Sequence, residues 1–212
     1  KPKVQGVLSL KEGVVYLAEI DLPAHIASLS LVFNQHLLIL ETVEGKMGAG
    51  RFSGRGKANF VGLHPGPFGF HLDLTEMPVQ LTRNLTGVVG GVILFQGDEK
   101  KQSLNGTLHI QKGLYNKRVD LRQLLLKWRE RQEERLPIET PFIGKTALNI
   151  HLYGKENIWV DNNVAKVALD VDLQMKGTIQ KPLLFGQINI PKGTFHFRTN
   201  EFKMVSGVVE FV

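Results

Sequence analysis

The sequence contains no cysteine, and no apolar run long enough to span a membrane. Without cysteine there is no disulfide framework and no soft thiolate ligand for a metal ion. This absence suits an exported bacterial protein that avoids disulfide chemistry, and it suits a cytosolic protein equally. No stretch approaches the roughly 20 consecutive apolar residues that a transmembrane helix requires. Membrane attachment, if the parent protein has it, therefore has to lie outside this stretch of sequence.

Recognisable catalytic and metal-binding patterns are also absent. The glycine-rich residues 45–56 lack the Gly-Lys-Ser/Thr ending of a phosphate-binding loop, and no Gly-x-Ser-x-Gly elbow is present. Asp170 and Asp172 share a strand face with Lys166 and Lys176, which indicates a solvated face rather than a catalytic carboxylate pair. The histidines are scattered singly, none with a second ligand at metal-binding spacing: His25, His36, His64, His71, His109, His151 and His196. We therefore predict no enzymatic activity, no metal site and no cofactor.

The chain is basic, with a net charge of +6 and a pI near 9.5. A basic surface is attracted to anionic partners, either phospholipid headgroups or nucleic acid. The basic residues are dispersed among Glu and Asp, and no aromatic and basic stripe of the kind that nucleic-acid-binding sheets carry is visible. The composition therefore favours a membrane lipid over nucleic acid as a partner.

What the sequence does contain is one short β pattern, used three times. Residues 104–115 (LNGTLHIQKGLY) align with residues 184–195 (LFGQINIPKGTF), and residues 4–15 (VQGVLSLKEGVV) repeat the pattern more loosely. Each copy alternates apolar and other residues, reaches a glycine and resumes with β-formers, which predicts a hairpin at 4–16, 104–115 and 184–197. Repeated units of this kind stack along an axis. We therefore expect residues 1–212 to form a single elongated β-repeat domain.

The alternation also assigns side chains to two faces of the expected sheet. Residues 25–33 and 36–43 are expected to pair around a turn at Asn34-Gln35, and residues 68–74 alternate cleanly. The longest alternation covers residues 165–175, which would span about 36 Å as one strand. The residues assigned to the apolar face are Leu29, Leu31, Phe33, Phe68, Phe70, Leu72, Leu74, Leu104, Leu108, Ile110, Leu148, Ile150, Leu152, Val167, Leu169, Val171, Leu173, Met175, Ile188, Ile190, Phe195 and Phe197. This set is the candidate binding surface.

An elongated sheet folded over like a U would turn this apolar face into an open trough. Such a trough accepts acyl chains by non-directional burial, at about 0.8 kcal/mol for each methylene removed from water. Glycines recur on the same face at Gly6, Gly106 and Gly186. They would leave room between neighbouring strands, although close packing of sheets explains them equally well.

One segment, residues 118–135, has a helical pattern instead. Leu121, Leu124, Leu125 and Trp128 lie at positions i, i+3, i+4 and i+7, which is one stripe of an amphipathic helix, and Pro137 ends it. The stripe fits a helix that covers the end or the open side of the sheet. Trp128 and the six basic residues of the segment fit an interfacial or gating helix instead.

The C-terminal third carries a family resemblance. Its ordered features are Gly177-Thr178, Pro182, Gly186, Gly193, Phe195, Phe197, Phe202 and the closing stretch from Ser206-Gly207 to Phe211. In this order they resemble the C-terminal domain of the TamB (translocation and assembly module) family, which is AsmA-like. The repeat at 104–115 and the helix-like insert fit the same family. The resemblance therefore extends over nearly the whole stretch.

The resemblance implies a mostly antiparallel, taco-like β fold with a hydrophobic groove. It also implies a location in the periplasm of a diderm bacterium, within a longer chain that is anchored in the inner membrane. The first residue, Lys1, and the end at Phe211-Val212 in mid-pattern agree with a fragment. The implied partners are phospholipid and an outer-membrane Omp85-type barrel (TamA- or BamA-like). Two functions stay open: a conduit for phospholipid between the two membranes, and a scaffold for outer-membrane protein or autotransporter assembly that uses exposed strand edges.

Overall fold

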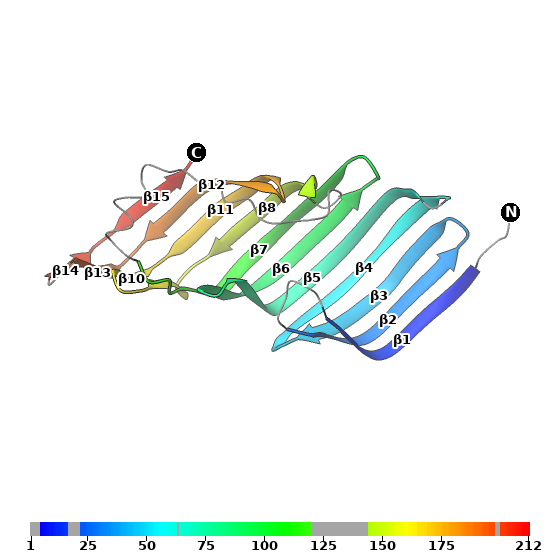
Figure 1. Ribbon diagram of the computed structural model, residues 1–212, viewed down its shortest axis with the longest axis horizontal. Coiled ribbons are helices and arrows are strands. Elements are labelled where there is room, and N and C mark those ends of the chain that lie inside the picture. The colour runs from blue at the N-terminus through cyan, green and yellow to red at the C-terminus, as the bar shows by residue number, and fades with distance from the viewer. Residues whose placement is uncertain (1–4, 17–21, 63, 120–143, 198–199) are drawn as a thin grey trace.

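The computed structural model describes residues 5–16, 22–62, 64–119, 144–197 and 200–212. All of the strands in these residues belong to one 15-stranded sheet, and the strands follow one another across it almost in chain order (Figure 1). The strands are β1 (Gln5–Val15), β2 (Ala24–Asn34), β3 (Leu37–Met47), β4 (Gly50–Val61), β5 (His64–Thr82), β6 (Leu85–Gly97), β7 (Gln102–Tyr115), β8 (Ala147–Gly154), β9 (Ile158–Asp161), β10 (Ala165–Ala168), β11 (Asp170–Thr178), β12 (Lys181–Ile190), β13 (Gly193–Phe197), β14 (Asn200–Met204) and β15 (Gly207–Phe211). The expectation of an all-β, mostly antiparallel fold is confirmed. No helix in the described part of the chain has the length and apolar character needed to cross a membrane.

Strand order shows one change of direction. From β1 to β7 every neighbouring pair is antiparallel, whereas β7 runs parallel to β8 and to β9. The described residues on either side of the connection between β7 and β8 lie at opposite ends of the strands. Val119 exchanges hydrogen bonds with the Asn163 side chain beside β10, whereas Gly144 accepts one from the Gln180 backbone beside β12. The predicted helix at 118–135, with Leu121, Leu124, Leu125 and Trp128, falls almost entirely on residues outside the described ranges.

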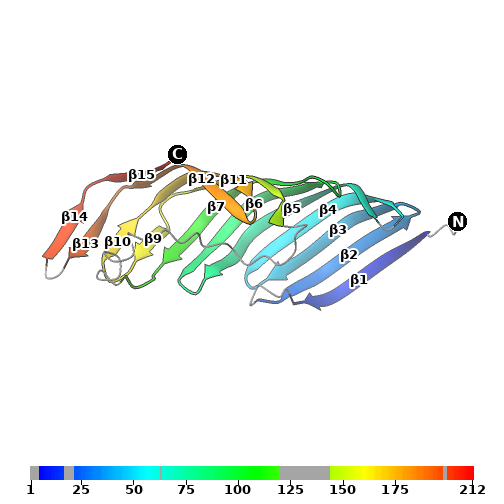
Figure 2. The same ribbon diagram turned by 45° about the horizontal axis from the view of Figure 1, so that its top comes forward.

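A line of irregular backbone crosses the sheet, and we call it the crease. In the last strands it is a complete break: β8 and β9 are separated at residues 155–157, β10 and β11 at Leu169, β12 and β13 at residues 191–192, and β14 and β15 at residues 205–206. These breaks are neighbours in space, since the Leu169 N–H donates to the Ile158 carbonyl and the Ala168 N–H donates to the Lys192 carbonyl. In Figure 2, β9, β10, β13 and β14 lie beyond this line.

In several of the earlier strands the same line carries bulges, whereas the pairing of β3 with β4 crosses it without a register shift. Register shifts occur between Ile26 and Ser28, between Leu74 and Met77, and between Val88 and Val89. Three of the four non-glycine residues with positive φ also lie on it: Glu12 (φ 61°), Glu76 (φ 51°) and Glu156 (φ 72°). Because a bulge bends its strand and increases its twist, aligned bulges and breaks bend the whole sheet along the crease.

The repeats cross the crease, and here the structure differs from the sequence prediction. Instead of folding back as hairpins at Gly13 and Gly113, the described residues 5–15 of the first repeat and residues 104–115 of the second each lie in one continuous strand, β1 and β7. Residues 184–197 follow β12 and then β13, which does not pair with β12 and extends the same path beyond the break. The predicted single strand at 165–175 is likewise interrupted, at Leu169. A glycine between two β runs signals a turn or a bend equally well, and here it marks a bend.

The predicted pairing of residues 25–33 with 36–43 is confirmed, with Gln35 at positive φ in the turn. Two glycines inside later strands occupy positions where any other residue would be strained. Gly91 (φ 143°) and Gly186 (φ 113°) sit inside strands, where a Cβ atom would overlap the carbonyl oxygens of Thr107 and Asp172 on the neighbouring strands. Such backbone is almost exclusive to glycine and permits close approach of strands.

Candidate functional site

The candidate site is one face of this sheet. Directly paired residues on neighbouring strands project their side chains to the same side, so the pairing register assigns every residue to a face. One row of paired residues runs through eight strands from β1 to β8: Leu8, Leu31, Leu40, Gly56, Phe70, Phe95, Leu104 and Leu148. A second row runs from β5 to β15: Leu74, Gly91, Leu108, Leu152, Leu173, Gly186 and Phe211. Both rows lie on what we call the apolar face.

The apolar face continues beyond the crease. Tyr115 pairs with Val160, which pairs with Val167, which in turn pairs with Gly193. Alternation along β13 then brings Phe195 and Phe197 to the same face. Leu169, at the break, packs against the buried cluster of Ile158, Val171 and Leu173. The register thus brings every predicted candidate residue in the described strands to one face.

Most of the buried apolar side chains near the crease lie on this face, although Ala168, which is 2% exposed, lies on the other. Ala24, Met47, Met77 and Val89 form one buried cluster, and all four lie on the apolar face next to the crease. Ile158, Val171 and Leu173 form the second, with exposures of 6–7%. Since all fifteen strands belong to a single sheet, the neighbours that bury these side chains come from the same face. Both buried clusters therefore lie on the apolar face.

Three phenylalanines of this face are partly exposed, although Ala58, Leu148 and Ile150 are buried away from the crease. Phe33 is 41% exposed, Phe195 is 37% exposed and Phe197 is 53% exposed. Within the described residues no second sheet covers them. Sequence reasoning missed further members of this face: Leu8, Leu10, Leu38, Leu40, Val43, Met47, Phe52, Met77, Val89, Ile93, Phe95, Ile158, Leu184, Val209 and Phe211. Many of them alternate as well, but each bulge shifts the alternation by one residue, and only the pairing reveals the shift.

The opposite, polar face carries the charged side chains. His71 lies 3.2 Å from Asp73, His151 lies 2.8 Å from Asp172, and all four of these side chains are at least 35% exposed. Within the described residues, no group of three or more His, Asp or Glu side chains is arranged to hold a metal ion. Asp170 accepts a hydrogen bond from the Glu156 backbone, so it and Asp172 have separate partners. This pattern is that of a solvated face.

The sheet also has free edges. β1 pairs only with β2, and its other side has no partner in the described residues. Val7 and Leu8 on this strand are 69% and 52% exposed. At the far end, β14 and β15 are edge segments of five residues each. β1 is therefore the longer open edge.

Comparison with known proteins connects this architecture to one family. The family model for the TamB C-terminal domain matches residues 41–212, which begins within β3 and covers every later strand. Comparisons with curated proteins and with solved structures gave no match. The matched region contains most of the crease, the parallel β7–β8 pair and most of the apolar face.

Proposed function

We propose a function that starts from one premise: the chain belongs to the TamB family, which has its role in the bacterial envelope. In this proposal the apolar face carries the acyl chains of phospholipid across the periplasm, between the inner and outer membranes. The parent chain is anchored in the inner membrane, and its other end meets an Omp85-type barrel. No step of this function requires catalysis.

The observation that carries the proposal is the continuity of the apolar face. One row of paired apolar residues passes through every strand from β1 to β8, and the other passes through β5, β6, β7, β8, β11, β12 and β15, both without an intervening charged residue. At about 4.8 Å between neighbouring strands, the eleven strands of the main path span roughly 48 Å. A surface of this length offers an acyl chain the same environment at each step, which suits movement along it.

The energetics support acyl chains as the cargo. Removing a methylene from water contributes about 0.8 kcal/mol, so a dozen methylenes gain on the order of 10 kcal/mol before ordering costs. A single introduced carboxylate would have to lose its hydration beneath the chain, which costs several kcal/mol. Lipid binding should therefore be highly sensitive to charge on this face and insensitive to charge on the other.

The test uses neighbouring residues on opposite faces of β7. Leu104→Asp places a carboxylate on the apolar face, and Ser103→Asp places the same group on the polar face. We expect native mass spectrometry and lipid extraction to find phospholipid with the wild-type chain and with Ser103→Asp, and to find it at least about tenfold reduced with Leu104→Asp. Phe70→Glu, on β5, should reproduce the loss. Equal lipid in Leu104→Asp and Ser103→Asp would contradict the proposal, provided that circular dichroism shows both to be folded.

A second candidate function rests on the open edge of β1. Its unpaired N–H and C=O groups form a template on which a client strand can add, as expected for a scaffold in outer-membrane protein assembly. Alternate N–H groups of β1 point away from β2, so one of Val7→Pro and Leu8→Pro removes a donor from the free edge. A scaffold loses client binding with that proline and tolerates Leu104→Asp. A lipid conduit shows the reverse.

A further inference from the structure

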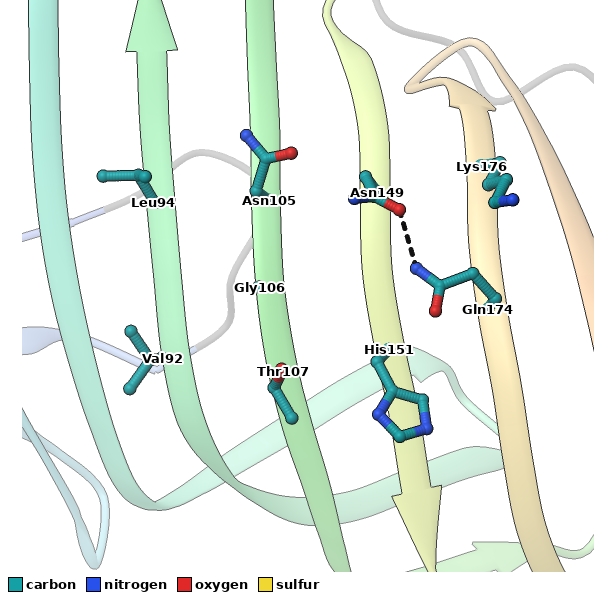
Figure 3. Close-up of a pocket in the computed structure, with 9 residues that line it drawn as sticks. All are labelled: Val92, Leu94, Asn105, Gly106, Thr107, Asn149, His151, Gln174 and Lys176. Carbon is teal, nitrogen blue, oxygen red and sulfur yellow. Dashed lines mark hydrogen bonds between the residues drawn. The ribbon is translucent and has the colours of Figure 1, made fainter.

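A pocket of about 570 Å³ lies on the polar face, in the middle of the sheet (Figure 3). Side chains from β6, β7, β8 and β11 line it, and the register places all of them on the face opposite to the acyl chains. The sheet itself separates the two faces, and five strands (β1 to β5) lie between the pocket and one edge and two (β12 and β15) between it and the other. A lipid held on the apolar face could place its headgroup here only by passing around the ends of the strands. The lining of the pocket itself therefore has to indicate a ligand.

Most of the polar wall is an array of neutral hydrogen-bonding groups. Asn105 is paired with Asn149, and Thr107 and Gln174 flank His151. The Gln174 Nε2 group donates to Asn149 Oδ1 over 2.8 Å, and both amides face the pocket (Figure 3). This bond uses one donor and one acceptor, which leaves the Asn149 N–H groups and the Gln174 oxygen for a ligand. The register spaces these groups about 4.8 Å apart from strand to strand.

The pocket also has surfaces that suit C–H groups. Val92 and Leu94 form its apolar wall on β6. Beside the pocket, the Tyr153 ring stacks on His109, with centroids 4.9 Å apart, and on His151 at 5.3 Å. Tyr153 is 40% exposed, so this stack presents a ring at the rim of the site. Amphipathic ring surfaces of this kind bind ligands that are polar at the edge and apolar on the face.

The charges at the site disfavour an anion. Lys176 is its one lysine, and its Nζ already lies 5.6 Å from the centre of the Phe185 ring. Asp172, beside the pocket, adds a carboxylate that holds the His151 imidazole at 2.8 Å. A phosphate ligand would face this carboxylate with one ammonium group to balance it. A neutral ligand with many hydroxyl groups meets no such repulsion.

We propose that the polar face over β6, β7, β8 and β11 binds an oligosaccharide. A sugar ring offers hydroxyl groups that donate and accept at its edge, which match Asn105, Asn149 and Gln174, and C–H groups on its faces, which match Tyr153, Val92 and Leu94. β-Sheet faces serve this purpose in other folds. The domain would then contact a glycan with one face while the other face remains free for lipid.

The test is NMR titration of the full chain with three soluble hexasaccharides: malto-, cello- and N-acetylchitohexaose. The test variant, Asn149→Ala with Gln174→Ala, removes the amide pair. The matched control, Gln187→Ala with Asn189→Ala, removes two amides from the same face on β12. We expect at least one hexasaccharide to shift resonances around the pocket, with affinity reduced about tenfold or more in the test variant and unchanged in the control. Tyr153→Ala should weaken the same titration.

Three results would overturn the proposal. The first is the absence of binding by every hexasaccharide up to about 10 mM, a concentration well above the weakest specific affinities. The second is binding that survives the test variant in a folded protein. The third is saturable binding of inorganic phosphate at the pocket, which would identify an anion site. None of these results depends on whether phospholipid co-purifies with the chain, so the proposed function stands or falls separately.

Discussion

The two faces of the sheet are made from the same strands, yet different interactions hold them. On the apolar face, side chains pack into clusters next to the crease, and Val171 and Leu173 are 7% and 6% exposed. On the polar face, neighbours of the same residues form exposed polar contacts such as the hydrogen bond between His151 and Asp172. Exposed pairs contribute little to stability, whereas buried apolar groups contribute about 25 cal/mol per Å². The stability of the fold therefore depends mainly on the apolar face.

The largest effect on stability should come from placing a charge on the apolar face. Val171→Asp buries an unpaired carboxylate beside Ile158 and Leu173 and should lower the free energy of unfolding by about 3–5 kcal/mol. Asp172→Asn, at the next residue but on the polar face, should change it by less than about 1 kcal/mol. Urea denaturation followed by circular dichroism measures both. Comparable losses in the two variants would show that the faces do not differ in this way.

A smaller effect should come from the strand-interior glycines. Gly186→Ala would place a Cβ atom against the Asp172 carbonyl at φ 113° and should cost about 1–3 kcal/mol. Gly6 also lies on the apolar face, but a Cβ atom there would meet nothing within 4 Å. Gly6→Ala should therefore be neutral or stabilise by up to about 1 kcal/mol. Equal costs in thermal unfolding would show that close strand approach does not set the need for glycine at position 186.

One substitution at the crease should stabilise the protein. Glu76 has φ 51°, a conformation that costs a non-glycine residue about 1–2 kcal/mol, so Glu76→Gly should raise the free energy of unfolding by up to about 1 kcal/mol. Glu44 lies on the polar face of β3 with ordinary backbone, and Glu44→Gly should lower it by about 0.5–1 kcal/mol. Opposite signs in urea denaturation would support the assignment of the crease. The same sign in both would argue against it.

The smallest effect concerns a turn between β6 and β7. Backbone N–H groups of Lys101 and Lys100 donate to the Asp98 carboxylate and hold the pKa of Asp98 below its usual value of 3.8. A lowered pKa adds stability that is present above the unfolded-state pKa and is lost as the pH falls through the folded-state pKa. The Asp98 carboxyl resonance should thus titrate below pH 3.8, and Lys101→Pro should raise its midpoint. An unchanged midpoint would show that another group lowers the pKa.

Much of the apolar face was predictable because alternation is a local property. Residues 68–74 and 104–110 keep a strict period of two, and their face assignments hold in the structure. The prediction was incomplete where bulges shift the period, as between Leu40 and Val43. It was wrong about the hairpins, since a glycine followed by β-formers specifies only a local change of direction. Whether the chain turns back or bends depends on which strands lie beside it.

The sequence by itself determined the β character, the two chemically distinct faces and the family. Each of these follows from residue types and from the spacing of residues that are close together in the chain. Only the tertiary structure decided which strands are neighbours, that β7 and β8 run parallel, and that the irregular positions of successive strands align into one crease. These features rest on contacts between residues far apart in the chain, such as Gly113 with Ile158 and Val167 with Gly193. Their stability comes from burial shared among several strands, and no single stretch of sequence contains it.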